Sequence, residues 1–213
     1  MKKKGHTLRL ALSHDDMAIR QQSTYVNNGT VEGFAYDGYS TGAVDDGSAL
    51  AQNAWVIMAT AINGDWKLPI AYFFNSSMDS YVGSNLVKRC LEWLYDTGAI
   101  VDTITFDGLI SNICTAENLG ARLQPDRNWV PYFPHPVEPK PGETAMPPIY
   151  VMLDAAHMVK LWRNVFGSSA QLQDFRGRSI SFEFVKKLHA LQEKEGLRAG
   201  NKLSSNHVNF SNK

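Results

Sequence analysis

Cysteine is scarce in this chain of 213 residues, with only Cys90 and Cys114. Both stand in stretches with helical spacing, and they form no CxxC pair. This usage argues against a disulfide framework and is typical of buried thiols in an intracellular protein. We therefore expect the fold to depend on a hydrophobic core.

A dominant charge is also missing. The chain has 21 Lys and Arg against 21 Asp and Glu, so no overall field demands nucleic acid or an anionic membrane. A nucleic-acid surface would have to be a local patch, such as Lys2–Lys4 or Lys186–Arg198. No apolar run approaches the length of a membrane span, and the opening "MKKKGHTLRLAL" is too short for a signal peptide. We expect no membrane partner.

Apolar patterning indicates several strands before the first helix. With 44% hydrophobic and 20% charged residues, the composition is that of a globular protein with a sizeable core. Alternation predicts a strand over Thr7–His14 that ends in Asp15 and Asp16. The run Ala54–Ile62 predicts a strand buried on both faces, and "KLPIAYFF" predicts another, with Pro69 at its beginning or on a sheet edge.

From Ser80 the period becomes helical, and Gly98 is a plausible helix stop. "AIVDTITFDG" then predicts a strand that ends at Asp107, followed by a helix marked by Ile110, Ile113, Cys114 and Leu119. Residues 125–148 hold eight of the nine prolines and predict an extended connection. The pattern of strand, acid and helix then repeats over "IYVMLDAAHMVKLWRNVF", with Asp154 as the acid and Met158, Leu161, Trp162 and Val165 on one helix side.

A strand meander followed by β-α-β crossovers is the layout of an RNase H-like α/β/α layered fold with a mixed central sheet. Asp15, Asp107 and Asp154 would each end one strand, and parallel neighbours would bring these ends to one edge. Carboxylates placed close together repel unless a cation lies between them, so such a site would take Mg²⁺ or Mn²⁺. The competing interpretation of Asp107 and of Asp154 is an N-cap of the helix that follows.

Six stretches, in order from about Leu8 to the C-terminus, resemble segments of P-element-type DNA transposases, a family often joined to a THAP zinc finger. They are "HDDMAIR", "NGDWKLPIAYFF", "ITFDGLISN", "YFPHP", "DAAHMVKLWRN" and "GLRAGNKLSSNHVNFSN". In "HDDMAIR", Asp15 matches the family's Asp, and Asp16 stands where Glu is usual. "ITFDGLISN" matches a strand with a D-G-x-x-x-N ending.

The resemblance implies a catalytic domain that cuts and joins DNA using acids on Mg²⁺ or Mn²⁺. By motif position, Asp15 and Asp107 match the first two catalytic aspartates, so Asp107 is interpreted as a metal ligand and not merely a cap. It further implies a core over residues 1–166, and over 167–213 the beginning of a helical insertion domain that binds GTP in the full-length family.

The departures from the family pattern predict incomplete chemistry. The family's last catalytic acid lies beyond the insertion, no Cys/His zinc-finger pattern precedes Thr7, and Asn201-Lys202 is not followed by the acid of an N-K-x-D guanine motif. We expect a truncated catalytic core that is inactive alone, nuclear, in contact with transposon-end DNA and open to self-association. The alternatives are a domesticated, non-enzymatic binder of DNA or transposase, and an RNase H-like nuclease with Asp154 as third acid.

The remaining candidate residues carry two interpretations each. Asp16 is expected to support structure or neighbouring ligands, and Asp154 is favoured as a helix cap over a third metal ligand. His157 is favoured as a satisfied, partly buried histidine over a supporting partner of the metal ligands or a phosphate contact. Lys160 and Arg163 are candidate DNA-backbone contacts. Trp66, Trp129 and Trp162 are expected to be packing residues.

Overall fold

The computed structural model describes residues 7–25, 31–35, 49–124, 128–138, 145–168, 172–196 and 203–209. The patch Lys2–Lys4 and the pair Asn201-Lys202 lie outside these residues. The chain divides into two compact units, Met1–Asp154 and Ala155–Lys213, which we describe separately. The boundary expected after residue 166 falls within the helix α3 and stays a prediction.

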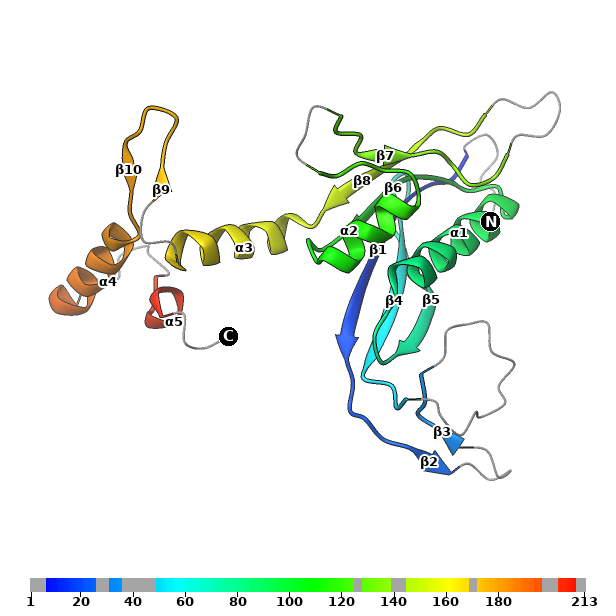
Figure 1. The fold of residues 1–213 in the computed structure, drawn as a ribbon, viewed down its shortest axis with the longest axis horizontal. Helices are drawn as coiled ribbons and strands as arrows, with labels where there is room; N and C mark the ends of the chain where they lie inside the picture. The colour runs from blue at the N-terminus through cyan, green and yellow to red at the C-terminus, as the bar shows by residue number, and fades with distance from the viewer. Residues whose placement is uncertain are drawn as a thin grey trace. The chain divides into compact units, whose positions relative to one another are not determined.

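The first unit is built on a six-stranded mixed sheet with the strand order β5-β4-β1-β6-β8-β7 (Figure 1). Strands β5, β4 and β1 pair antiparallel, β1, β6 and β8 are parallel neighbours, and β7 pairs antiparallel with β8. The bounds of these strands, in chain order, are β1 Arg9–Ala18, β4 Asn53–Ala61, β5 Lys67–Asn75, β6 Ile100–Phe106, β7 Tyr132–Phe133 and β8 Ile149–Leu153. A short hairpin of β2 (Thr24–Tyr25) and β3 (Val31–Glu32) stands apart from this sheet. The order and directions confirm the predicted RNase H-like class.

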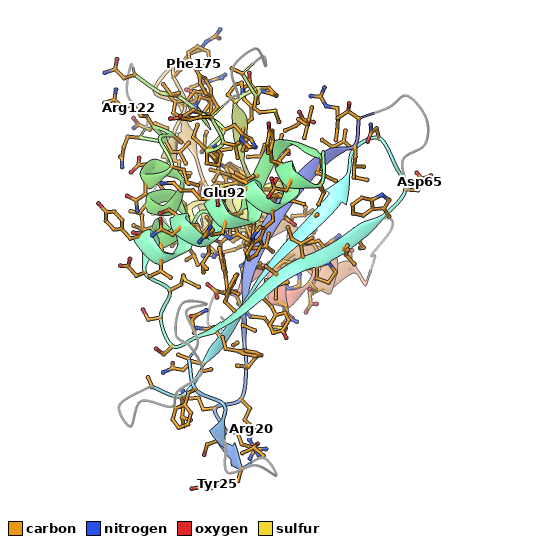
Figure 2. The ribbon with its side chains drawn as sticks, turned by 90° about the vertical axis from the view of Figure 1, so that its right-hand side faces the viewer. Arg20, Tyr25, Asp65, Glu92, Arg122 and Phe175 are labelled. Carbon is orange, nitrogen blue, oxygen red and sulfur yellow. The ribbon has the colours of Figure 1, made fainter. Side chains whose placement is uncertain are left out.

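Two helices pack side by side across one face of the sheet (Figures 1 and 2). The N-cap of helix α1 (Ser80–Asp96) is Asp79, whose carboxylate accepts a hydrogen bond from the amide of Tyr81. The helix ends before Gly98, which has a φ of 79° that suits glycine. Four of the residues that α1 buries are apolar and lie at the predicted helical spacing: Leu86, Val87, Cys90 and Leu91. Helix α2 (Ile110–Asn118) follows β6, as predicted, and Ile110, one of the residues that marked it in the sequence, is 74% exposed.

The opposite sheet face is open within the described part of this unit. Along β4, Trp55, Ile57, Ala59 and Ala61 are buried under the helices, whereas the intervening Val56 and Met58 are only half-buried. The prediction that this strand is buried on both faces is therefore wrong, because helices cover one face alone. Apolar side chains on the uncovered face of the other strands remain exposed: Tyr72, Phe74, Tyr150 and Met152.

Two further expectations are corrected in this unit. Residues 125–148 do not form only an extended connection, because β7 lies within them and Phe133 is 1% exposed in the core. Trp66 and Trp129 are exposed rather than packed, and the tryptophan that fills the core is Trp55. Pro69 lies on the edge strand β5, as predicted, next to Ile70, an extra residue of β5 that shifts the register against β4.

A β-bulge sets the register of the two central parallel strands. Leu10 pairs with Val101 and Ala11 with Thr103, so Asp102 is an extra residue without a partner in β1. Arg9 holds this residue through an ion pair, with its Nε donating to Asp102 Oδ2 at 2.7 Å. Every residue of β6 after the bulge is therefore displaced by one position against β1.

The second unit contains three helices and a short hairpin in its described part. Their bounds are α3 Ala155–Ser168, β9 Leu172–Gln173, β10 Ser179–Ile180, α4 Glu183–Glu195 and α5 Ser205–Val208. Phe166 packs edge-on against Phe182, with ring centroids 5.2 Å apart. Trp162 packs against Phe166, with ring centroids 5.0 Å apart, but is 61% exposed, so it is a packing residue at the surface and not a core residue. No described helix in either unit has the length and apolar character needed to cross a membrane.

Candidate active site

The first two candidate acids stand at equivalent positions of neighbouring parallel strands. The last cross-strand pair of β1 and β6 is Ser13 with Thr105, and the rings of the next residues, His14 and Phe106, stack with centroids 5.1 Å apart. Asp15 and Asp107 directly follow this stacked pair. The sheet therefore brings their backbones level at the carboxyl edge, where open α/β sheets place ligands.

Strand β1 does not end at its acids. Asp15 pairs with Val56 and Asp16 with Trp55, and β1 continues to Ala18. The prediction of a strand that ends in these two acids is wrong, because β4 is long enough to supply backbone partners as far as Ala18. The ladder holds the backbone of both acids, while their side chains alternate between the two faces.

Asp107 begins the turn into α2 without being its N-cap. The N-cap residue is Leu109, whose side chain makes no capping bond. Oδ1 of Asp107 accepts the amide of Leu109 at 3.1 Å and Nδ2 of Asn112 at 2.8 Å. Within the described residues, Oδ2 of this carboxylate accepts no hydrogen bond, so one oxygen is committed to the turn and the other is available.

A buried histidine lies beside the two acids. His14 is 4% exposed, and its Nδ1 accepts the indole Nε1–H of Trp55 at 3.0 Å. This bond leaves the proton of the neutral ring on Nε2, which has no hydrogen-bond partner among the described residues. Burial lowers the pKa of His14 to about 4, although the charge of Asp107 acts in the opposite direction. His14 is therefore neutral at physiological pH.

Asp16 is an exposed residue whose carboxylate is partly desolvated and held differently from that of Asp15. Its Oδ1 accepts Nδ2 of the buried Asn75 at 3.2 Å. Burial raises the pKa of Asp16, the bond from Asn75 lowers it, and the charges of Asp15 and Asp107 raise it. The charges of the other two acids thus act on Asp16, whose polar anchor, Asn75, lies on β5.

Asp154 continues the same row of acids on the next parallel strand. Phe106 pairs with Leu153, and the amide of Asp154 donates to the carbonyl of Phe106 at 2.8 Å. The backbone of Asp154 is therefore adjacent to that of Asp107. The prediction that strands bearing Asp15, Asp107 and Asp154 are parallel neighbours is confirmed; their roles as ligands or caps stay predictions.

The chemistry of these side chains suits a hard divalent cation. Carboxylate oxygens are the ligands that Mg²⁺ and Mn²⁺ take, and Asp107 offers an oxygen that its turn does not use. Among the described residues, however, no three His, Cys, Asp or Glu side chains are gathered closely enough to hold a metal. The residues fit a weak site in which Asp15 and Asp107 supply protein ligands and water supplies the rest.

In the second unit, the residues predicted to contact DNA differ in exposure and in the hydrogen bonds they make within the protein. Nη2 of Arg163 donates to the carbonyls of Asn206 and His207, each at 3.1 Å, so this side chain supports the last turn of α5. Lys160 is exposed and His157 is half-buried on α3. Their proposed contacts with DNA stay predictions, and for Arg163 such a contact would compete with these bonds.

Three residues at the first site were missed by sequence reasoning: His14, Asn75 and Asn112. Asn112 had a signal, since it is the last residue of the D-G-x-x-x-N pattern. His14 and Asn75 had none, because their partners lie on other strands.

The strand order and the row of acids define an RNase H-like domain. Residues 1–120 match the family model "TNP-like, RNase H N-terminal domain", and residues 156–213 match "TNP-like, GTP-binding insertion domain". The chain belongs to this TNP-like, P-element-type transposase family, as its motifs predicted.

Two relatives place the chain further. It is 26% identical over 181 residues to "DNA transposase THAP9" of Homo sapiens, a match that spans 84% of this chain and 19% of the relative. Its fold resembles that of the "Drosophila P element transposase strand transfer complex", with a TM-score of 0.70 and 20% identity, over 96% of this chain and 39% of that one. The chain therefore spans a minor part of either relative's length.

Proposed function

We propose that this chain supplies part of the catalytic core of a cut-and-paste DNA transposase, with Asp15 and Asp107 as carboxylate ligands of Mg²⁺ or Mn²⁺. The observation that carries the proposal is the level placement of these two acids on the central parallel strands of an RNase H-like sheet. Membership of a transposase family and a relative named as a DNA transposase support the reaction class.

The residues of this chain would divide the work at the site. Asp15 and Asp107 would hold the cation, which supplies activation of an attacking water or hydroxyl and stabilisation of the leaving oxygen of a phosphodiester. The neutral His14 adds no positive charge that would compete with the metal. DNA would be held through local Lys and Arg contacts, since the chain as a whole carries no net charge.

We further propose that the second unit forms the first portion of a GTP-binding insertion domain, and that the protein acts on transposon-end DNA in the nucleus. Residues 156–213 match a model of such a domain. The sequence departs from a guanine-reading motif after Asn201-Lys202, so we do not assign a complete GTP site to these residues. Self-association belongs to the same proposal.

Calorimetric titration with Mn²⁺ tests the metal site. Asp107→Asn removes one ligand charge and should weaken Mn²⁺ binding by tenfold or more, because few other protein ligands remain. The matched control is Asp65→Asn, which removes the same charge in the exposed turn between β4 and β5 and should bind as the wild type does. Equal affinity in the wild type and Asp107→Asn would remove Asp107 from the site.

The chain alone should not nick supercoiled plasmid in Mn²⁺. Two-metal phosphoryl transfer needs enough carboxylates to hold both ions in line, and small misplacements cost about a hundredfold in rate. The second candidate function is a nuclease with Asp154 as a third ligand, which its place beside Asp107 favours. Nicking that disappears in both Asp107→Asn and Asp154→Asn would establish that alternative.

A further inference from the structure

The carboxylate of Asp107 is fixed by two donors that converge on a single oxygen. The amide of Leu109 and Nδ2 of Asn112 both donate to Oδ1, at 3.1 and 2.8 Å. Two donors on one oxygen restrict rotation of the carboxylate plane and settle which oxygen faces away from the turn. Since no described residue donates to Oδ2, the arrangement presents that atom to an outside partner.

Asn112 is placed to do this with little freedom of its own. It lies in the first turn of α2 and is 9% exposed, so its side-chain amide is packed among protein atoms and cannot turn outward to bind water. The residues directly before and after it, Ser111 and Ile113, are more exposed, and Asn112 shares the buried side of α2 with Thr115 and Ala116. A polar side chain that a helix buries in its first turn, with a carboxylate as its acceptor, is explained by the carboxylate it holds.

We infer that Asn112 is a positioning residue for the metal site, which orients Asp107 by occupying Oδ1 and so directs Oδ2 to the cation. This inference rests on the proposed function, because it needs Asp107 to be a ligand. Groups that hold a metal-binding carboxylate through hydrogen bonds tune affinity by about 10- to 100-fold. Asn112 would act through Asp107 and touch neither the cation nor DNA.

The chain contains a matched control in Asn75. This asparagine is 7% exposed and donates Nδ2 to a carboxylate in the same way, but its partner is Asp16. Leucine has nearly the shape of asparagine and donates nothing, so Asn112→Leu and Asn75→Leu remove one buried amide each. Only the first change frees Asp107.

The experiment is a Mn²⁺ titration of the full 213-residue chain as wild type, Asp107→Asn, Asn112→Leu and Asn75→Leu. Asn112→Leu should weaken binding by about tenfold, and Asn75→Leu by less than twofold. Wild-type affinity in Asn112→Leu, or equal losses in both leucine variants, would overturn the inference. A wild type that binds no Mn²⁺, or binds it as Asp107→Asn does, would refute the proposed function itself and the inference with it.

A second readout uses the unmutated side chain, in case Asn112→Leu does not fold. In ¹⁵N-resolved NMR spectra, the side-chain amide signals of Asn112 should shift when Mg²⁺ is added and when Asp107 is replaced by Asn. The signals of Asn75 should shift much less in both cases. A purely structural role at the start of α2 predicts no response of Asn112 to Mg²⁺, and that result would count against positioning.

Discussion

Replacement of His14 by phenylalanine should remove a pH dependence from the stability of the first unit. Burial lowers the pKa of His14 from an ordinary value of 6.5 to about 4 in the folded chain. The folded state therefore resists protonation that the unfolded state accepts. The contribution is fully present above pH 6.5, and it is lost as the pH falls from 6.5 towards 4.

The size of the effect follows from the same two values. Each unit of pKa difference corresponds to about 1.4 kcal/mol, so the whole contribution is roughly 3 kcal/mol. Between pH 7.5 and 4.5 the wild type should lose about 2–3 kcal/mol through this residue. His14→Phe keeps an aromatic ring against Phe106 but leaves the indole N–H of Trp55 unpaired, which costs about 1–3 kcal/mol at every pH.

The free energy of unfolding of the wild type and of His14→Phe can be measured by urea unfolding at several pH values in this range, followed by near-ultraviolet circular dichroism. His14→Phe should be the less stable protein at pH 7.5, and the gap should narrow as the pH falls. Other titrating groups, such as Asp16, are common to both proteins and largely cancel in the difference. A gap that stays constant, or a pKa near 6.5 for His14 by NMR in the folded chain, would refute the reasoning.

Two further outcomes are expected. Cys114 should react with iodoacetamide before Cys90, because Cys90 is buried and burial raises the pKa of its thiol to about 11. Peptide mass spectrometry would show the order of labelling, and equal labelling of the two cysteines would contradict the prediction. Leu91→Ala should lower the free energy of unfolding by about 2–5 kcal/mol, because Leu91 is 0% exposed. The control, Leu68→Ala at a 55% exposed site, should lower it far less. Similar losses for both variants in urea unfolding would argue against the packing described for α1.

Local patterns predicted what is decided locally. The period of α1 and its end before Gly98 depend on residues close together in the chain, and both were predicted. The parallel neighbours β1, β6 and β8 followed from the order of strands and crossover helices. The acids at this edge were found because each follows an apolar run.

What sequence reasoning missed depends on pairing between distant segments. The extension of β1 through Asp15 and Asp16 comes from its ladder with β4, and nothing within the polar residues themselves predicts a strand there. The anchor of Asp16 is more than fifty residues away, on the edge strand β5. The partial exposure of Val56 and Met58, in a strand predicted to be buried on both faces, was likewise settled by which sheet face the helices cover.

The bulge at Asp102 determines which of two consecutive acids of β1, Asp15 or Asp16, lies level with Asp107. An unbroken ladder from the pair Leu10–Val101 would bring Asp16 level with Asp107, and the extra residue brings Asp15 there instead. Because strand side chains alternate, this offset also decides which sheet face receives the acid. The guanidinium fork of Arg9 grips both oxygens of the bulged residue. This ion pair lies at the bulge and contacts none of Asp15, Asp16 and Asp107. It nevertheless supports the strand register that places Asp15, and not Asp16, beside Asp107.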